Sequence, residues 1–265
     1  MPNHDPRALL ERRLRPRKPG LLDIDSPLEH FALITYAVPP ERLASHIPTD
    51  RFEIATFEIE GEQRALLSVV PFIDADFRLR LLPFARFRFA QTNYRVYVTD
   101  RKTGEPVVWF FGTTLGGWPV HLARLLWKIP WYPAQYTWTC EFDEAKGRYE
   151  TYRYEMRSKW GAARIDVRDT GAPVDTLRGF SSRDEMTLVL THPVDGYFYR
   201  LDGRVGTYSV SHEVLPLTVA EPVDLHFALL ERLGVLSAAE MQQPHSVLLC
   251  RKTNFHIYMP PRRVR

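Results

Sequence analysis

Polar side chains recur at every second position in the segment RFRFAQTNYRVYVTD, residues 86–100. Successive side chains of a strand point to opposite faces, so a strand here would gather these residues on one face: Gln91, Asn93, Arg95 and Tyr97. A guanidinium that is buried in such a row needs an anion. We consider two partners for Arg95, namely the carboxylate or phosphate of a bound ligand and an Asp or Glu of the protein itself.

A second segment whose residues could form a functional site is LLWKIPWYPAQY, residues 125–136. Its prolines fix the backbone and remove amide donors, so the segment should hold its large flat side chains stiffly. Trp131 and Tyr132 follow the first proline directly and could form the wall of a ligand cavity. They could equally fill the core, because small barrels often have room only for side chains.

The segment SVSHEVLPL carries His212 beside Glu213. Neighbours on a strand point to opposite faces, so the two side chains cannot form a local acid–base pair. His212 could still reach a pocket and act as an acid or a base, or it could be a structural histidine. The other histidines and the two cysteines show no metal-ligand spacing, and no glycine-rich phosphate loop is present, so we predict neither a metal nor a cofactor.

The composition sets limits on the class of protein. The chain has 265 residues, of which 45% are hydrophobic and 25% charged, with a net charge of +3. This balance does not indicate a nucleic-acid-binding protein, and no apolar run is long enough to cross a bilayer. With two cysteines and no signal peptide at the start, we expect a cytoplasmic protein without a nucleic-acid or membrane partner.

Four arginines alternate with apolar residues in FRLRLLPFARFRF, residues 77–89. The pattern could form a basic, aromatic patch for a membrane surface or an anionic polymer. It is also typical of a charged hairpin edge around a turn at the proline, which blocks strand pairing, and we favour that interpretation.

Strands must position these residues, because apolar alternation and continuous apolar runs dominate from residue 31 onward. We predict nine to twelve strands that mostly connect by hairpins, in an antiparallel sheet that is strongly curved or closed. We also predict two or three helices, including residues 117–129, which end at Pro130, and residues 223–235. Residues 26–265 should form a single domain behind a basic N-terminal arm, residues 1–25, which we interpret as a solvated and partly ordered tail.

The order of several segments is similar to that of a known family. ITYAVPPERLASHIP, SVVPF, QTNYRVYV, VVWFF, the helix ending in LLWKIPWYPA, and SVSHEVLPL follow one another as in the YqjF-like family of uncharacterised bacterial proteins. The resemblance covers roughly residues 28–260. This family belongs with acetoacetate decarboxylase in one superfamily. The resemblance therefore implies a mainly β (α+β) fold, a closed, cone-shaped antiparallel β-barrel with its site in the barrel mouth.

The resemblance also implies that the known chemistry is missing. Acetoacetate decarboxylase forms a Schiff base through one of two adjacent lysines that directly follow the proline at the end of a helix. Here Pro130 is followed by Trp131 and Tyr132, and Lys128 precedes the proline. Gln91 stands where the decarboxylase has a glutamate, and Glu29 where it has an arginine. Decarboxylation of acetoacetate by this chain is therefore not expected.

Two functional hypotheses remain from the sequence. In the first, the barrel binds a small acidic or keto-bearing metabolite, as a binding protein or as an enzyme of unassigned chemistry. Its expected site residues are Gln91, Asn93, Arg95, Tyr97, Trp131, Tyr132 and His212. In the second, the chain is a non-catalytic structural or regulatory homo-oligomer whose barrel is filled.

Overall fold

The computed structural model describes residues 5–15, 17–117 and 119–264, and thirteen strands from these residues form one continuous sheet. In chain order the strands are β1 (Ile24–Val38), β2 (Phe52–Ile54), β3 (Thr56–Ile59), β4 (Glu62–Leu79), β5 (Arg86–Asp100), β6 (Pro106–Leu115), β7 (Trp131–Asp143), β8 (Arg148–Ser158), β9 (Gly161–Pro173), β10 (Asp195–Tyr199), β11 (Val205–His212), β12 (Thr218–Phe227) and β13 (Ser246–Arg263). The helices are α1 (Pro6–Leu14), α2 (Glu41–Ala44), α3 (Pro119–Trp127), α4 (Arg183–Leu190), α5 (Ala228–Arg232) and α6 (Ala238–Met241).

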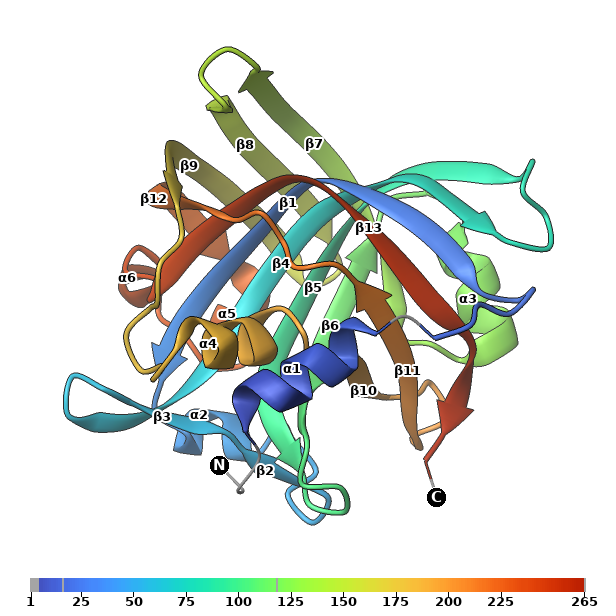
Figure 1. Cartoon of the computed structure of the whole chain (residues 1–265), viewed down its shortest axis with the longest axis horizontal. Helices are drawn as coiled ribbons and strands as arrows, with labels where there is room; N and C mark the ends of the chain where they lie inside the picture. Colours follow the sequence, from blue (N-terminus) through green and yellow to red (C-terminus); the bar gives the residue numbers. More distant parts are fainter. Residues whose placement is uncertain (1–4, 16, 118, 265) are drawn as a thin grey trace.

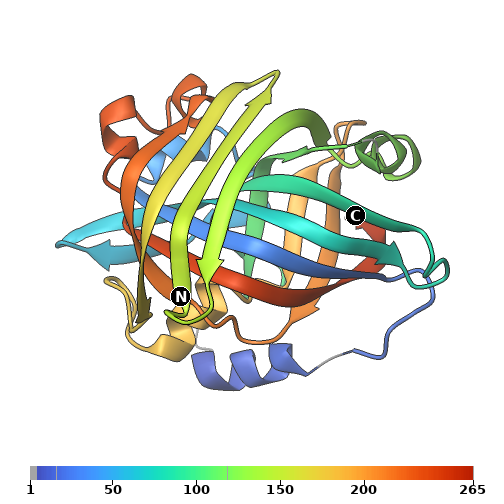
Figure 2. The ribbon, with the colours of Figure 1, turned by 90° about the horizontal axis from the view of Figure 1, so that it is seen from above.

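The strand pairings close the sheet into two rings that share strands (Figures 1 and 2). The shared strands are β13, β1, β4, β5 and β6, in that order. On one side β10 and β11 complete a ring of seven strands, and on the other side β7, β8, β9 and β12 complete a ring of nine. The prediction of a mainly β, closed sheet is confirmed.

The sheet is not antiparallel throughout, which corrects the expectation from the sequence. β6 pairs in parallel with both β7 and β10, at Thr113↔Trp131 and Gly196↔Val108 among other positions. Parallel neighbours need a crossover connection rather than a tight hairpin. The segment that contains α3 is this crossover between β6 and β7.

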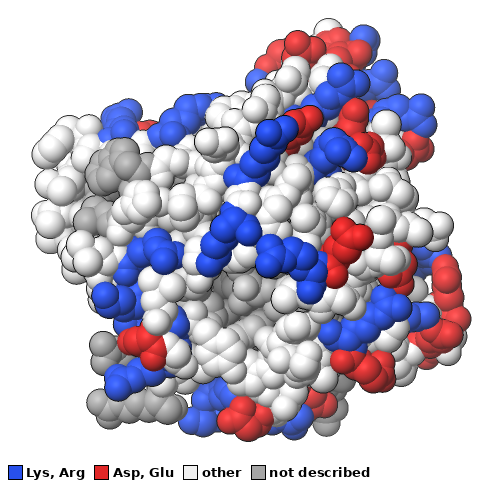
Figure 3. Space-filling model, turned by 180° about the vertical axis from the view of Figure 1, so that it is seen from behind, with Lys and Arg blue, Asp and Glu red and all other residues white. Residues whose placement is uncertain are grey.

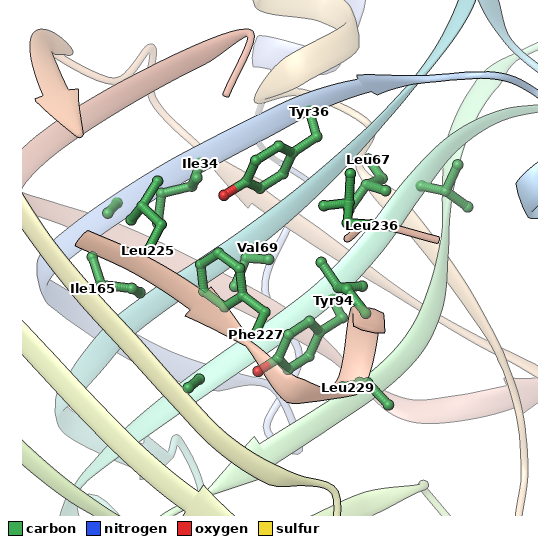
Figure 4. Close-up of a cluster of buried hydrophobic side chains, with 14 of the residues drawn as sticks. Ile34, Tyr36, Leu67, Val69, Tyr94, Ile165, Leu225, Phe227, Leu229 and Leu236 are labelled. Carbon is green, nitrogen blue, oxygen red and sulfur yellow. The ribbon is translucent and has the colours of Figure 1, made fainter. Parts of the chain in front are cut away.

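The central parts of β1, β4, β5 and β6 are buried on both faces, because each ring encloses its own interior. Tyr94, Val96 and Val98 of β5 belong to the core of the nine-stranded ring, whereas Tyr97 belongs to the core of the other. Figure 4 shows part of the first core, where the ring of Phe227 packs between the rings of Tyr36 and Tyr94. The two-sided burial explains why residues 31–38 of β1 and residues 65–73 of β4 are nearly continuous apolar runs in the sequence. The predicted division of the β5 side chains between two faces is confirmed.

The described part of the chain has six helices rather than two or three, and only α1, α3 and α4 are longer than five residues. The helix predicted over residues 223–235 is helical only in part, because its first five residues belong to β12. β12 continues to Phe227, pairs with β9 and buries Leu225 and Phe227 at alternate positions. Only Ala228–Arg232 form a helix there. None of the described helices is long and apolar enough to span a membrane.

The N-terminal arm is not a solvated tail where the structure describes it; residues 1–4 and 16 lie outside the described residues. Asp5 caps α1, and Leu9 and Leu10 are buried against Leu188 of α4. The buried guanidinium of Arg13 holds α1 to the barrel through Glu105 and nearby carbonyl groups. The local sequence does not reveal this docking, because the partners of α1 are the apolar side chain of Leu188 and the distant Glu105.

Candidate ligand-binding site

The seven-stranded ring encloses a cavity of about 380 Å³. Its wall is mainly apolar, and its lining residues come from both the shared strands and the closing strands β10 and β11. Val70, Phe110 and Leu215 line one end and are buried, whereas Leu82 lines the other end and is 42% exposed. The cavity is therefore closed at the α4 end and open beside the β4–β5 hairpin.

Arg95 lies at the closed end of the cavity. Its Nη2 donates to the backbone oxygen of Leu190 at 2.8 Å, and its guanidinium lies 5.6 Å from the ring centre of Tyr97. Its Nε is buried and has no hydrogen-bond partner. No Asp or Glu among the described residues forms an ion pair with it. Of the two partners considered for this guanidinium, the internal carboxylate is thus not found among these residues.

Two amide side chains continue the polar row along β5. Gln91 Nε2 donates to Asn93 Oδ1 at 2.9 Å, and Thr113 Oγ1 donates to the same oxygen at 2.9 Å. Both amides line the cavity and are buried. Because the Asn93 oxygen already accepts two hydrogen bonds, the group that Asn93 offers to a cavity ligand is its amide nitrogen, a donor.

Asp74 is a polar residue of the cavity that the sequence analysis missed. Its side chain accepts a hydrogen bond from Ser26 Oγ at 2.5 Å through Oδ1, while Oδ2 is buried without a partner. Burial raises the pKa of this carboxyl to about 7, although the Ser26 hydrogen bond acts in the opposite direction. A signal was present, since Asp74 follows Val70 and Phe72 at period two within an apolar strand.

Trp131 and Tyr132 lie on opposite sides of β7. Trp131 lines the cavity, as one of the two sequence-level interpretations expected. Tyr132 does not line it but packs edge-on against Trp160, with ring centres 4.7 Å apart. Lys159 Nζ lies 3.6 Å from the Tyr132 ring centre, and the Arg124 guanidinium lies 4.7 Å from it. The expectation for Tyr132 is corrected because neighbours on one strand cannot share a face.

Tyr97 and His212 are near the cavity but behind its wall. The Tyr97 hydroxyl lies 2.7 Å from Ser68 Oγ within the core. The ring nitrogens of His212 lie 2.7 and 2.8 Å from the backbone oxygens of Glu213 and Thr191, and burial lowers the pKa of the ring. Neither side chain lines the cavity. The structure thus brings together Gln91, Asn93, Arg95 and Trp131 of the expected site.

Lys128, the lysine nearest in sequence to the matched pair, and Glu29, matched to the decarboxylase arginine, both lie outside the cavity. Lys128 follows α3 directly, is exposed, and has a left-handed backbone with φ of 56°. Glu29 pairs with Arg88 at 2.8 Å, outside the cavity. No lysine is among the described residues that line the cavity.

The fold is that of acetoacetate decarboxylase-like proteins. An acetoacetate decarboxylase from Legionella pneumophila superposes with a TM-score of 0.60 at 14% identity, covering 95% of this chain and 92% of that one. An acetoacetate decarboxylase-like enzyme from Sphingomonas wittichii RW1 gives 0.60 at 10% identity over 93% and 94%. The enduracididine biosynthesis enzyme MppR complexed with pyruvate gives 0.58 at 13% identity over 91% and 89%.

Within this fold class the chain belongs to the DUF2071 family, described as an uncharacterized conserved protein. The family pattern matches residues 26–254, which are most of the chain. No curated protein matches the sequence. The identities to the solved structures are low, so those structures establish the fold and not the activity.

Proposed function

We propose that this protein binds a small acidic or keto-bearing metabolite in the cavity of the seven-stranded ring, with Arg95 as the anion-binding residue. The observation that carries the proposal is the Arg95 guanidinium, which faces the closed end of a cavity and has no carboxylate partner among the described residues. A partly desolvated guanidinium is costly without an anion. A ligand carboxylate would supply that anion with the geometry that guanidinium groups favour.

Neighbouring groups support this assignment of the ligand class. The Asn93 amide nitrogen is a further donor facing the cavity, so carboxylate or carbonyl oxygens of a ligand would find partners along β5. MppR, which has a similar fold, is complexed with pyruvate, a keto acid. In this chain Tyr97, Tyr132 and His212 would act from behind the wall rather than by contact with the ligand.

We further propose that the protein does not decarboxylate acetoacetate through a Schiff base. That reaction needs a neutral lysine amine next to the substrate ketone. Trp131 and Tyr132 occupy the positions that match the lysine pair, and no lysine is among the described lining residues. The proposal is therefore one of binding, and no reaction is assigned.

The alternative function is a structural or regulatory oligomer with a filled barrel. It predicts side chains packed through the whole interior of both rings. The nine-stranded ring is packed in this way, but the cavity of about 380 Å³ in the seven-stranded ring weighs against the alternative.

The test is a thermal-shift screen of wild type, Arg95→Met and Arg88→Met against carboxylates, keto acids and phosphate esters. A ligand at 100 times its dissociation constant stabilises the fold by about 2.7 kcal/mol. We expect acids to stabilise the wild type and Arg88→Met but not Arg95→Met. Arg88 is the matched control because it lies on the same strand and pairs with Glu29 outside the cavity. No stabilising acid, or equal stabilisation of Arg95→Met, would refute the proposal.

A further inference from the structure

The cavity has its charge at one end and its opening at the other. Arg95 of β5 pairs across the sheet with Ser68 of β4. Asp74, which also lines the cavity, lies six residues after Ser68 along β4. At about 3.3 Å per strand residue, these two positions are roughly 20 Å apart along the strand. A three-carbon acid bound at Arg95 would leave most of this length unfilled.

The wall between the two positions is apolar. Phe72 lines it from β4, Tyr208 and Val210 from β11, and Ile257 from β13. Among the described residues that line the cavity, the Asp, Glu, Lys and Arg residues are Arg95 and Asp74. When Asp74 is protonated, Arg95 is the one charge that faces the cavity from these residues. The lining thus matches a ligand with one anionic head and an apolar body.

Exposed apolar side chains, which we call the rim, lie in two adjacent segments beside the opening: Leu21, Leu22, Leu81, Leu82 and Phe84. The second segment lies in the sequence between the partly exposed Arg80 and the exposed Arg86. The backbone N–H of Leu81 donates to the oxygen of Leu21 at 2.9 Å, so the two segments of the rim lie side by side. Leu82 both lines the cavity and reaches the surface, which makes the rim continuous with the cavity, and Phe84 is 81% exposed.

The rim lies at the end of the molecule that carries the β4–β5 hairpin and α3 in Figures 1 and 2. Figure 3 shows this end from behind, on the side of α3, where the described side chains are mostly uncharged. Exposed apolar residues that cluster in this way mark binding surfaces.

We propose that the ligand is an amphiphile, a carboxylic acid with an extended apolar chain, whose head binds Arg95 and whose chain runs through the cavity to the rim. This inference rests on the proposed function and narrows its ligand class from small acids in general to long-chain acids. It follows from the distance between head site and opening, from the apolar wall, and from the rim beside the opening.

The first experiment is calorimetric titration of the wild type with pyruvate, butanoate, hexanoate, octanoate and decanoate. Each buried CH₂ contributes about 0.8 kcal/mol, so affinity should rise roughly fourfold per added carbon until the chain reaches the rim. 1-Decanol should bind more weakly than decanoate to the wild type, and this preference should vanish in Arg95→Met. Equal affinity for pyruvate and decanoate would overturn the inference but leave the proposed function standing. Binding of no carboxylate would overturn both.

Two variants test the path of the chain independently. Val210→Phe places a larger side chain in the middle of the cavity, so it should weaken decanoate and spare butanoate. Leu82→Ser changes a side chain at the open end of the cavity that is 42% exposed. This variant should fold normally, so it tests the proposal even if Val210→Phe does not fold. It should weaken decanoate several-fold and leave hexanoate unchanged. Loss of affinity that is uniform over all chain lengths in both variants would contradict the proposed path.

Discussion

Asp74 is a cavity residue whose charge depends on the fold. Its side chain is 3% exposed, and one of its oxygens accepts a single hydrogen bond from Ser26 while the other has no partner. Water would solvate both oxygens in the unfolded chain, so folding penalises the ionised form. The pKa rises from 3.8 to about 7 for this reason. Asp74 is thus a neutral group in the folded protein over most of the acidic range.

We expect Asp74→Asn to stabilise the protein in a pH-dependent way. Because the folded pKa is raised, wild-type stability from this group is fully present below pH 3.8 and is lost as pH rises to about 7. At about 1.4 kcal/mol per pKa unit, the loss at pH 8 is roughly 4 kcal/mol. The free energy of unfolding in urea, measured from pH 4 to 8.5, should show the variant gaining on the wild type mainly between pH 4 and 7. A difference that is constant over this range would contradict the assigned burial.

At the residue scale the sequence predicted the polar face of β5, because alternation places Gln91, Asn93 and Arg95 together wherever that strand lies. It could not predict that Tyr97, on the same face, is covered by Ser68 and the end of α4, since that depends on a distant segment. Trp131 and Tyr132 were separable in principle. They follow the helix-ending Pro130 on a strand, and strand neighbours point to opposite faces.

The docking of α1 is the main contact at the element scale that can be tested by mutation. Arg13 has a side chain that is 3% exposed, and its Nη2 lies 3.1 Å from Glu105 Oε2. It also donates to the backbone oxygens of His192 at 2.6 Å and Pro106 at 2.8 Å. Arg12 pairs with the same glutamate but is 61% exposed. The two neighbours therefore provide a matched comparison of a buried and an exposed ion pair.

We expect Arg13→Ala to destabilise the protein by about 3 kcal/mol, because Glu105 and two carbonyl groups lose a buried partner. Arg12→Ala should cost less than about 1 kcal/mol, as exposed ion pairs do. Urea midpoints with unchanged slopes would measure both effects. Equal effects of the two substitutions would show that α1 is not held in the way described.

The elements differ in how far the sequence predicts them. Pro130 marks the end of α3, and alternation predicts β5 with its bounds. A helix was predicted over residues 223–235 because Leu229, Leu230 and Leu233 fit helical spacing. Leu225, Phe227 and Leu229, however, also fit the period of two that is typical of a strand. Both patterns are real, since the strand passes directly into α5 at Ala228. The pairing with β9, which continues to Phe227, decides where the strand ends and the helix begins.

At the scale of the whole molecule, β13 closes both rings. One edge of β13 pairs with β1, and its other edge pairs first with β12 and then, further along, with β11. The first and last strands of the sheet are thus neighbours, although more than 200 residues separate Phe31 from Cys250, which pair directly. We propose that residues 26–265 unfold as one cooperative unit for this reason.

Removal of residues 246–265 should therefore abolish cooperative unfolding in urea and the β signal in circular dichroism. Removal of residues 1–20, an equal length that takes away α1, should lower the midpoint and leave one sharp transition. A folded core without β13, or two separate transitions in the intact chain, would be incompatible with a single unit.

The closed sheet was predictable from the number and spacing of strands, but the two rings were not. They depend on β6 pairing in parallel with β7 and β10, and a parallel neighbour across a crossover carries no local sequence signal. The cavity could not be predicted from the sequence either, because the same alternating apolar residues can fill the interior of a ring or line a cavity within it.

The shared wall of five strands has a consequence for how this family can change over time. Along β5, even-numbered positions such as Tyr94 and Val96 pack into one interior, while odd-numbered positions such as Gln91 and Asn93 meet the cavity. Substitutions at the odd set can reshape what is bound while the even set keeps the architecture. Among relatives, substitutions should therefore be concentrated at every second position of β5. A lineage could in this way acquire a new ligand while its fold stays the same.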